Sequence, residues 1–323
     1  MDRPKILLTR RWPKSVEKHL TERYDVTFNE TDKPLETSEL RDAMLHFDAV
    51  CPTVSDRVGG DILNVIGRRA KILGNYGVGF NHIDIETCKK LGIVVTNTPD
   101  VLTDCTADLA LTLMLMIARR AGEGERQLRA RSWNGWRPTH LLGTKVTGKT
   151  LGLVGFGRIG QATAARAHHG FGMRIVYYSR HRAAPEVEQT TGATHCPDLD
   201  DLIRQSDFIS LHCPGGPETR HLINEERIAK MKPGAFLINT ARGEVVDETA
   251  LVDALKHNRI AGAGLDVYER EPDVPNAMIA LNNVVLLPHL GSATTETRVE
   301  MGMRVARNLD AYFDGKEPPD RVV

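Results

Sequence analysis

Short apolar runs alternate with stretches of helical pattern along almost the whole chain, and this alternation limits the fold more than any other feature. Each run is four or five residues long and is mainly apolar at consecutive positions, as strands covered on both faces require. Strand–helix alternation of this kind predicts parallel sheets with helices on both faces, and therefore the α/β class. The runs occupy residues 5–9, 48–51, 70–73, 93–96, 150–154, 174–178, 208–211, 235–239, 262–266 and 284–287.

The runs form two series, and a chain of 323 residues is long enough for two domains at roughly 150 residues each. Residues 97–100, Asn-Thr-Pro-Asp, punctuate the end of the first series, and one long helical pattern follows over about 102–129. Pro288 ends the second series, and residues 294–313 show a single helical pattern before a loop-like tail. Such a closing helix could pack on the first domain, but its pattern alone does not decide this.

Lysine plus arginine and aspartate plus glutamate both number 42, so the formal net charge is zero. This balance argues against a general attraction to nucleic acid or to an anionic membrane. The first apolar run is too short for a secretory signal, and the longest apolar stretch, 109–118, falls short of the about 20 residues that span a bilayer. We therefore expect a cytoplasmic protein without nucleic-acid or membrane partners, and a buried helix at 109–118.

The five cysteines are scattered and odd in number, and they form no C-x-x-C pair. Neither a disulfide framework nor a cysteine-rich zinc site fits this pattern, so free thiols in a reducing cytoplasm are expected. The adjacent His168 and His169 would point to different sides of a helix. We therefore expect no metal site.

A glycine-rich segment connects the run at 150–154 to a helical pattern that starts at Gln161. In this position Gly155 permits a tight turn, Gly157 lets the backbone approach a pyrophosphate, and Gly160 permits close packing of helix and strand. The N–H groups at the start of the helix then face the phosphates. The segment predicts a dinucleotide site, although a turn that only satisfies geometry is the alternative. Its residues are Gly155, Phe156, Gly157, Arg158, Ile159 and Gly160.

The residues after the next apolar run bear on which dinucleotide binds. An NAD site usually carries Asp or Glu about 20 residues beyond the glycines, for the ribose 2′-hydroxyl. Here Ser179, Arg180 and Arg182 follow the run, and no acidic residue comes before Glu186. Arginine suits a 2′-phosphate through charge-assisted bonds. We expect NADP(H), with NADPH preferred and NADH usable, while a solvated basic turn is the alternative.

Eight short motifs occur in order, at residues 75–84, 97–99, 106–110, 155–160, 211–214, 239–243, 264–272 and 287–294. Together they resemble the D-isomer-specific 2-hydroxyacid dehydrogenase family and, within it, the glyoxylate/hydroxypyruvate reductase branch, over nearly the whole chain. The resemblance implies two doubly wound parallel-sheet domains, with a Rossmann cofactor domain inserted into a flavodoxin-like substrate domain. The substrate domain would comprise residues 1–99 and 289–323, and the NADP(H)-binding domain residues 100–288.

The same resemblance implies reduction of a small 2-oxo acid, such as glyoxylate or hydroxypyruvate, to the D-2-hydroxy acid with NADPH. The active site would lie in the cleft between the domains, with hinges near Pro99 and Pro288. A homodimer is expected, with the helix at 106–118 at its interface, although core burial explains that apolar helix equally well. Trp133 and Trp136 would border the substrate pocket, or simply pack at the interface.

The reaction needs a cation that holds the substrate carboxylate, a proton donor, and a group that orients this donor. His289 is the candidate donor because imidazole titrates near neutral pH, and Arg242 is the candidate cation. Glu271 would bind the other ring nitrogen, fixing the tautomer and favouring the protonated ring. Arg242 and His289 follow predicted strands, where open α/β sheets bind ligands. Singly, each could be an ordinary loop or surface residue, but the family carries Arg, Glu and His at these positions.

The loop at 77–79 should offer backbone N–H groups to the substrate carboxylate at Val78 and Gly79, unless it is a plain tight turn. Arg242 and His289 would bind the substrate as well. By the resemblance, Asp266 would accept from the nicotinamide amide, and further residues would line the cofactor cleft. The cofactor-contacting residues implied in this way are Thr106, Cys213, Pro214, Thr219, Thr240, Ala241, Arg242, Asp266, His289, Gly291 and Ser292.

Two alternatives stay open at this point. Some relatives of the family sense dinucleotides in transcriptional regulation, and a dehydrogenase for another acid, such as 3-phosphoglycerate, would share the motifs. A formate dehydrogenase would carry Gln where Glu271 stands. The third carbon of the substrate is not defined, because small groups in a small pocket change binding by only about 1–3 kcal/mol each.

Overall fold

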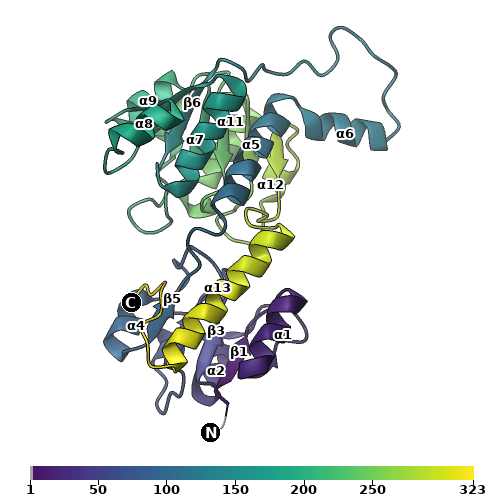
Figure 1. The fold of residues 1–323 in the computed structure, drawn as a ribbon. Helices are drawn as coiled ribbons and strands as arrows, with labels where there is room; N and C mark the ends of the chain where they lie inside the picture. The colour runs from purple at the N-terminus through teal and green to yellow at the C-terminus, as the bar shows by residue number, and fades with distance from the viewer. Residues whose placement is uncertain (1–2) are drawn as a thin grey trace. The chain divides into compact units, whose positions relative to one another are not determined.

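The computed structural model describes residues 3–323, which form two compact units (Figure 1). One unit comprises the described residues up to Leu102 together with Ser292–Val323, and the other comprises Thr103–Gly291. The divisions lie at 102 and 291, three residues after the expected boundaries at 99 and 288. The first unit is therefore discontinuous in sequence.

The first unit is built on a five-stranded parallel sheet. Its strands are β1 (Lys5–Leu8), β2 (Asp25–Phe28), β3 (Ala49–Cys51), β4 (Ile72–Gly74) and β5 (Val94–Thr96). Its helices are α1 (Lys14–Arg23), α2 (Thr37–His46), α3 (Gly60–Leu63), α4 (Ile85–Leu91) and α13 (Thr295–Phe313). The strand order is β2-β1-β3-β4-β5, which is the flavodoxin-like order. Residues of α2, α3 and α4 pack on one face of the sheet, against Leu7, Val50 and Leu73.

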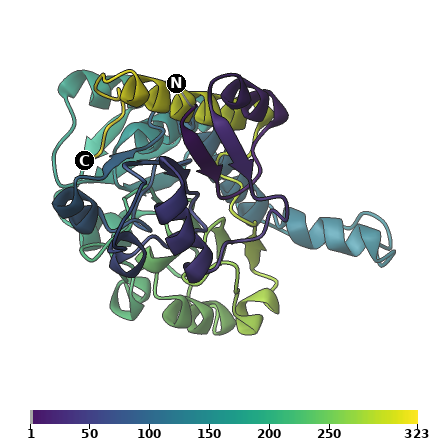
Figure 2. The ribbon, with the colours of Figure 1, turned by 90° about the horizontal axis from the view of Figure 1, so that it is seen from below.

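Helix α13 packs on the other side of this sheet, so the closing helix returns to the first unit. Figure 2 shows it, in yellow, beside the purple N-terminal elements, and it contacts both α1 and β4. A Cβ on Gly74 of β4 would lie 2.8 Å from Val305 Cγ1 of α13, and one on Gly302 of α13 would collide with α1. Beyond the helix, Val322 N–H donates to Val95 O at 2.7 Å, which adds the end of the chain to the edge of β5.

The second unit is built on a seven-stranded parallel sheet. Its strands are β6 (Thr150–Val154), β7 (Arg174–Tyr178), β8 (Ala193–His195), β9 (Phe208–Leu211), β10 (Phe236–Asn239), β11 (Gly262–Leu265) and β12 (Val284–Leu286). Its helices are α5 (Thr103–Ala118), α6 (Ala121–Arg129), α7 (Arg158–Phe171), α8 (Pro185–Thr191), α9 (Leu199–Gln205), α10 (Glu225–Ala229), α11 (Glu248–Lys256) and α12 (Asn276–Ile279), with a 3₁₀ turn η1 at Gly243–Val245.

The strand order of this sheet is β12-β11-β10-β9-β6-β7-β8, which reverses its direction of growth between β6 and β9. This reversal is the switch point of the Rossmann fold, outside which ligands bind. Helices α5 and α7 bury their apolar residues on one face, and α9, α10 and α11 bury theirs on the other. The predicted fold class is therefore confirmed: both sheets are parallel and have helices on both faces.

The apolar-run pattern missed two strands, β2 and β8, and both are edge strands. Their sequences, Asp-Val-Thr-Phe and Ala-Thr-His, are only partly buried and carry polar residues. An edge strand is covered less fully than a central strand, so a continuous apolar run is not required there.

The single helix expected over about 102–129 is wrong, because the chain forms two helices there. The break falls at Arg120, whose φ of 52° lies in the left-handed region. The carbonyl of Ala118 accepts from Thr144 N–H at 2.7 Å, since residues 143–144 pass directly against the end of α5. Gly122 and Gly124 further weaken the helical pattern after the break. Tertiary packing of a distant segment therefore ends α5.

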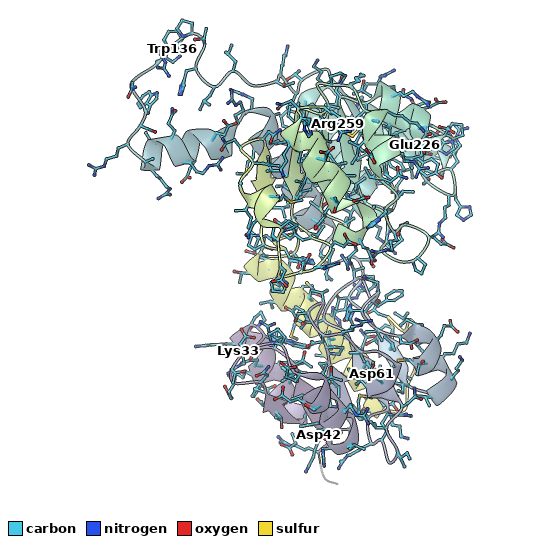
Figure 3. The ribbon with its side chains drawn as sticks, turned by 180° about the vertical axis from the view of Figure 1, so that it is seen from behind. Lys33, Asp42, Asp61, Trp136, Glu226 and Arg259 are labelled. Carbon is cyan, nitrogen blue, oxygen red and sulfur yellow. The ribbon has the colours of Figure 1, made fainter. Side chains whose placement is uncertain are left out.

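Helix α6 and the loop after it extend away from the rest of the second unit (Figures 1 and 2). None of the residues of α6 is buried. Figure 3 shows Trp136 at the outer part of the following loop, where its side chain is 81% exposed. Trp133 is 50% exposed. By contrast, one face of α5 is buried in the core of its own unit, which is the core burial given above as the alternative to a dimer interface.

Replacing the fully buried Leu113 of α5 by alanine is expected to lower the free energy of unfolding by about 2–5 kcal/mol, because a cavity is left in the core. Chemical denaturation followed by circular dichroism measures the change. The control is Ile279→Ala on the same unit, where the side chain is 58% exposed and a change below about 0.5 kcal/mol is expected. Equal effects of the two substitutions would contradict the assignment of α5 to the core.

Candidate active site

The glycine segment between β6 and α7 is shaped by contacts that only glycine allows. Gly155 has a φ of +94°, and a Cβ there would lie 2.6 Å from Cys213 N. A Cβ on Gly160 would lie 2.5 Å from Gly155 O. A Cβ on Gly157 would meet no atom of the described chain within 4 Å. Packing within the protein therefore explains Gly155 and Gly160, whereas the open side at Gly157 fits the approach of a ligand.

The start of α7 fits a phosphate group. Its N-cap residue is Gly157, so no side chain caps the helix. The N–H groups of the first turn of a helix lack partners within the helix, and they carry the positive end of its dipole. With the dinucleotide loop leading directly into it, α7 can hold a pyrophosphate on these N–H groups.

The predicted 2′-phosphate residues follow β7, and they differ in how firmly they are held. Arg182 makes two hydrogen bonds to Glu188, at 2.9 and 2.8 Å. This arginine and the hydroxyl of Tyr177 lower the pKa of Glu188 to about 2. Arg180 is 74% exposed and makes one contact of 3.2 Å with the exposed Glu218. Arg180 is therefore the more available cation, while Arg182 fastens the turn to α8.

The predicted cofactor wall after β9 and β10 contains one buried polar atom that lacks a partner. Thr240 Oγ1 has no hydrogen-bond partner among the described residues, although Thr240 is only 8% exposed. A buried hydroxyl without a partner fits a bound ligand that completes its hydrogen bonding. In the same wall, burial raises the pKa of Cys213 to about 11, so that side chain stays an uncharged thiol. Thr219 donates to Pro214 O at 2.7 Å and closes the loop between them.

His289 and Glu271 form a hydrogen-bonded pair, with 2.7 Å between Nδ1 and Oε2. Because a carboxylate can only accept, Nδ1 donates and Nε2 is the ring nitrogen left to face a substrate. The other carboxylate oxygen, Oε1, accepts from Tyr268 N–H at 3.0 Å. The two side chains are 29% and 33% exposed, so the pair is partly screened from water.

The charges near this pair explain the ionisation of Glu271. Burial raises its pKa, but the hydrogen bond and charge of His289, the N–H of Tyr268 and the charge of Arg242 together outweigh burial and lower it. Glu271 therefore stays a carboxylate at neutral pH. Burial lowers the pKa of Arg242, against the nearby carboxylates of Glu271 and Glu244, but a guanidinium remains charged in proteins.

A turn after β10 presents Arg242. Asn239 Nδ2 donates to Arg242 O at 2.9 Å, and Ala241 N–H donates to Asn239 Oδ1 at 3.0 Å. Asn239 is 1% exposed, so the turn is fastened from inside the sheet. Arg242 and Glu271 interact electrostatically. One unit thus brings together the three residues that the sequence proposed for the chemistry.

Asp266, expected at the cofactor, has a structural role that its residue type and position in the sequence did not indicate. It is fully buried, and its carboxylate accepts from Leu290 N–H at 2.6 Å and from Gly291 N–H at 2.8 Å. Its carbonyl accepts from His289 N–H at 2.9 Å. Thr106 Oγ1 donates to Gly291 O at 3.0 Å. These bonds hold His289 at its left-handed φ of 55°. The predicted contacts of Asp266 and Thr106 with a cofactor stay predictions.

In the first unit, the loop of Gly77, Val78 and Gly79 is fastened through its carbonyl groups. The side-chain amide of the fully buried Asn75 donates to Gly77 O and Gly79 O, both at 3.0 Å, and Asn97 Nδ2 donates to Val78 O at 2.8 Å. With its carbonyls engaged, the loop can offer N–H groups to an anion. Neither asparagine was expected to take part in the site, although both lie within the sequence motifs at 75–84 and 97–99. Ser292, another predicted cofactor residue, is also in the first unit.

The described residues contain no group of three or more His, Cys, Asp or Glu side chains that could hold a metal ion. All five cysteines are free. Over the same residues, every helix is too short or too polar to cross a membrane.

Comparisons with known proteins identify relatives of this chain. Residues 111–291 match the model of the D-isomer specific 2-hydroxyacid dehydrogenase NAD-binding domain. The chain is 47% identical to a glyoxylate reductase of Thermococcus onnurineus, over 99% of this chain and 96% of that one. It is 40% identical to a glycerate dehydrogenase of Hyphomicrobium methylovorum, over 98% of each chain.

Among solved structures, the chain resembles an NADPH-dependent glyoxylate/hydroxypyruvate reductase of Sinorhizobium meliloti in complex with NADP and malonate. The TM-score is 0.88 at 34% identity, over 100% of this chain and 97% of that one. These matches confirm the resemblance seen in the sequence motifs. The chain belongs to the D-isomer specific 2-hydroxyacid dehydrogenase family.

Proposed function

We propose that this protein reduces glyoxylate or hydroxypyruvate to the D-2-hydroxy acid, with NADPH preferred over NADH. The observation that carries the proposal is the hydrogen bond of 2.7 Å between Glu271 and His289, beside Arg242. The named activities of the relatives from Thermococcus and Sinorhizobium support it. The glycerate dehydrogenase from Hyphomicrobium fits as well, because hydroxypyruvate is the oxidised form of glycerate.

The proposed chemistry adds a hydride and a proton across the carbonyl group of the acid. When bound, the dinucleotide supplies the hydride to C2. Arg242 binds the substrate carboxylate and polarises the carbonyl oxygen, while the N–H groups of Val78 and Gly79 take part in binding the carboxylate. His289 donates its Nε2 proton to the carbonyl oxygen, and Glu271 orients the ring and stabilises its protonated form.

Apart from Ser292, the residues that would hold the cofactor belong to the second unit. The pyrophosphate would bind the segment from Gly155 to Gly160 and the start of α7. The 2′-phosphate would bind Ser179 and Arg180, with Arg182 as a further positive charge. The nicotinamide would lie beside Thr240, Ala241 and Asp266. The remaining proposed contacts are Thr106, Cys213, Pro214, Thr219, Gly291 and Ser292.

We further propose that the second unit is the cofactor domain, that the first is the substrate domain, and that the protein is a cytoplasmic homodimer. The segment from α6 to Leu142, which extends away from the rest of the second unit, supports the dimer, since its large exposed apolar side chains would otherwise face water. These side chains are Leu128, Trp133, Trp136 and Leu142. A purely sensing protein is less well supported, because it would not need a histidine paired with a carboxylate.

Replacing His289 by asparagine is expected to lower kcat for glyoxylate by about 10²–10⁴-fold, because the proton donor is lost. The KM for NADPH should change little. Steady-state kinetics at 340 nm measures both. The control is His257→Asn, at an exposed histidine after α11. An His289→Asn enzyme with normal kcat would rule out this proton donor.

Replacing Glu271 by glutamine is expected to lower kcat and to move the alkaline decline of reduction to lower pH, because the carboxylate no longer favours the protonated imidazole. In the wild type the lowered pKa of Glu271 keeps this carboxylate charged through neutral pH, so the pair breaks only in acid. The pH profile of kcat from about pH 5 to 10 measures the shift. An unchanged profile in the variant would contradict the orienting role.

Replacing Arg180 by aspartate is expected to raise the KM for NADPH by about 10- to 100-fold and to spare NADH. A charge-assisted hydrogen bond contributes about 1.5–3 kcal/mol, and each 1.4 kcal/mol corresponds to about a factor of ten. The control is Arg204→Asp, the same change of charge on an exposed arginine of α9. Equal loss with both cofactors, or loss in the control, would refute recognition of the 2′-phosphate by Arg180.

A further inference from the structure

Glu248 is a nearly buried carboxylate that the proposed chemistry does not use. It is the first residue of α11, it is 8% exposed, and burial raises its pKa. The helix does not need it as a cap, because the side chain of Asp247 accepts from Ala250 N–H at 3.0 Å. Burying a carboxylate is unfavourable without strong partners, so the partner of Glu248 indicates its role.

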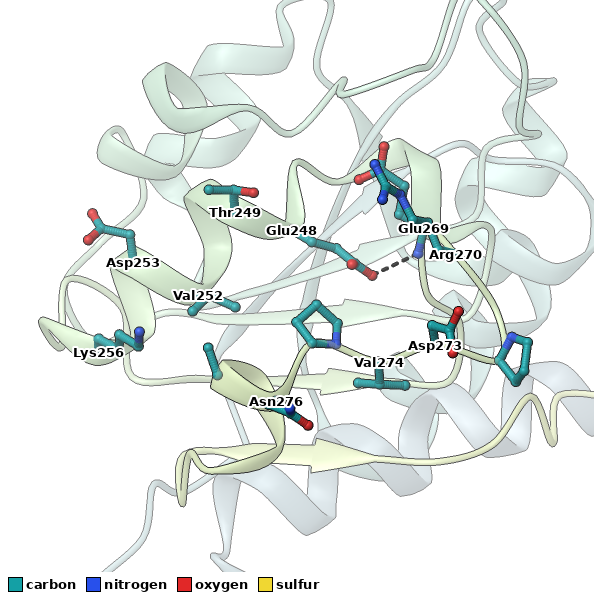
Figure 4. A pocket seen from close by; sticks show the side chains of 13 residues that line it. Glu248, Thr249, Val252, Asp253, Lys256, Glu269, Arg270, Asp273, Val274 and Asn276 are labelled. Atoms are coloured by element: carbon teal, nitrogen blue, oxygen red, sulfur yellow. Dashed lines mark hydrogen bonds between the residues drawn. The ribbon is translucent and has the colours of Figure 1, made fainter.

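That partner is the main chain beside the catalytic pair. Glu248 Oε1 accepts from Glu269 N–H at 2.7 Å, the bond drawn in Figure 4. Both residues line an open pocket of about 970 Å³ between α11 and the segment 269–277. Glu269 lies two residues before Glu271, whose Oε1 accepts from the preceding Tyr268 N–H. Consecutive N–H groups of one short segment therefore bind Glu271 and Glu248.

Glu269 is also held through its side chain, from a different part of the unit. Arg220 Nη2 donates to Glu269 Oε1 at 2.6 Å, and His221 Nε2 lies 3.1 Å from the same oxygen. The main chain of His221 donates to Glu244 O at 2.8 Å, in the turn after Arg242. Glu269 is thus anchored at both its N–H and its carboxylate, although it touches no proposed reacting group.

The same peptide supports the loop that presents Arg242. A Cβ on Gly243 would lie 1.8 Å from Tyr268 C and 2.3 Å from Glu269 N. The backbone after Arg242 therefore packs directly on the Tyr268–Glu269 peptide, with no room for a side chain between them. Movement of this peptide would shift Glu271 and Arg242 together.

We propose that Glu248 is a positioning residue: by accepting the Glu269 N–H it fixes the Tyr268–Glu269 peptide, and through it the Glu271–His289 pair and Arg242. The charged groups facing Glu248 are Glu269, Arg270 and Glu271, so its own negative charge gains little from its surroundings. The hydrogen bond from Glu269 N–H, rather than the charge of Glu248, therefore holds this peptide in place. The effect on turnover rests on the function proposed above.

Two variants separate the hydrogen bond from the charge. Glu248→Met keeps the length of the side chain but replaces the carboxylate by a thioether, which accepts only weakly, and Glu248→Gln keeps an acceptor oxygen without the charge. The control is Asp253→Asn, which neutralises another carboxylate of α11 in the same pocket, paired with Arg259 rather than with the Glu269 segment. All three variants are made in the full chain and compared with wild type.

With Glu248→Met we expect kcat for glyoxylate to fall about tenfold or more, since small misplacements of catalytic groups reduce rates strongly. The KM for NADPH should stay within about twofold, and the pH profile of kcat should shift toward that of Glu271→Gln. Glu248→Gln should restore kcat to within about threefold of wild type, and Asp253→Asn should match wild type. Equal losses in Met and Gln variants, or a wild-type kcat in Glu248→Met, would overturn the proposal.

A second readout needs no substrate. The ¹⁵N NMR signals of the His289 ring, assigned by their loss in His289→Asn, report the hydrogen bond to Glu271. We expect these signals to shift in Glu248→Met and to be retained in Glu248→Gln and Asp253→Asn. If wild type reduces neither acid but the signals shift as expected, the proposed function fails and the positioning role stands. If wild type is active and the signals stay unchanged in Glu248→Met, the positioning role fails alone.

Discussion

The carboxylate of Asp266 is the interaction on which the geometry of the candidate site depends. It lies fully buried at the carboxyl end of β11 and binds the N–H groups of Leu290 and Gly291. Its main chain also bonds to Asn239 on one side and to His289 on the other. The loops after the neighbouring strands β10, β11 and β12 are therefore all held by Asp266. These bonds keep the backbone of His289 in the left-handed region.

Glu248 also holds a loop through a backbone hydrogen bond, but it lies further from the residues proposed for the chemistry. Like Asp266, it is a buried carboxylate whose burial raises its pKa, and it accepts a hydrogen bond from a backbone N–H. A backbone N–H lies at a position set by the fold, so such a bond fixes a loop more rigidly than a pair of long surface side chains. Glu271 differs because His289 lowers its pKa, so this carboxylate stays charged beside the proposed proton donor.

Much of this could be predicted from the sequence. Continuous apolar runs located all the central strands, because a central parallel strand must be apolar on both faces. The glycine motif was recognisable from residue type and order, and the resemblance to the family pointed to the set of Arg242, Glu271 and His289. The edge strands β2 and β8 were not, since partial exposure removes the apolar signal. The break at Arg120 was also missed, because it depends on a hydrogen bond from Thr144 N–H to the carbonyl of Ala118.

By itself, the sequence determined the α/β class and the glycine loop, because both are written in local pattern, and its resemblance to a known family singled out the three residues proposed for the chemistry. Only the tertiary structure decided that α13 returns to the first unit, and that the carboxylates of Asp266 and Glu248 accept from backbone N–H groups. The physical reason is distance along the chain. Glu248 and Glu269 are 21 residues apart, and Asp266 and Leu290 are 24 apart. No local pattern records a hydrogen bond that only the folded backbone brings within reach.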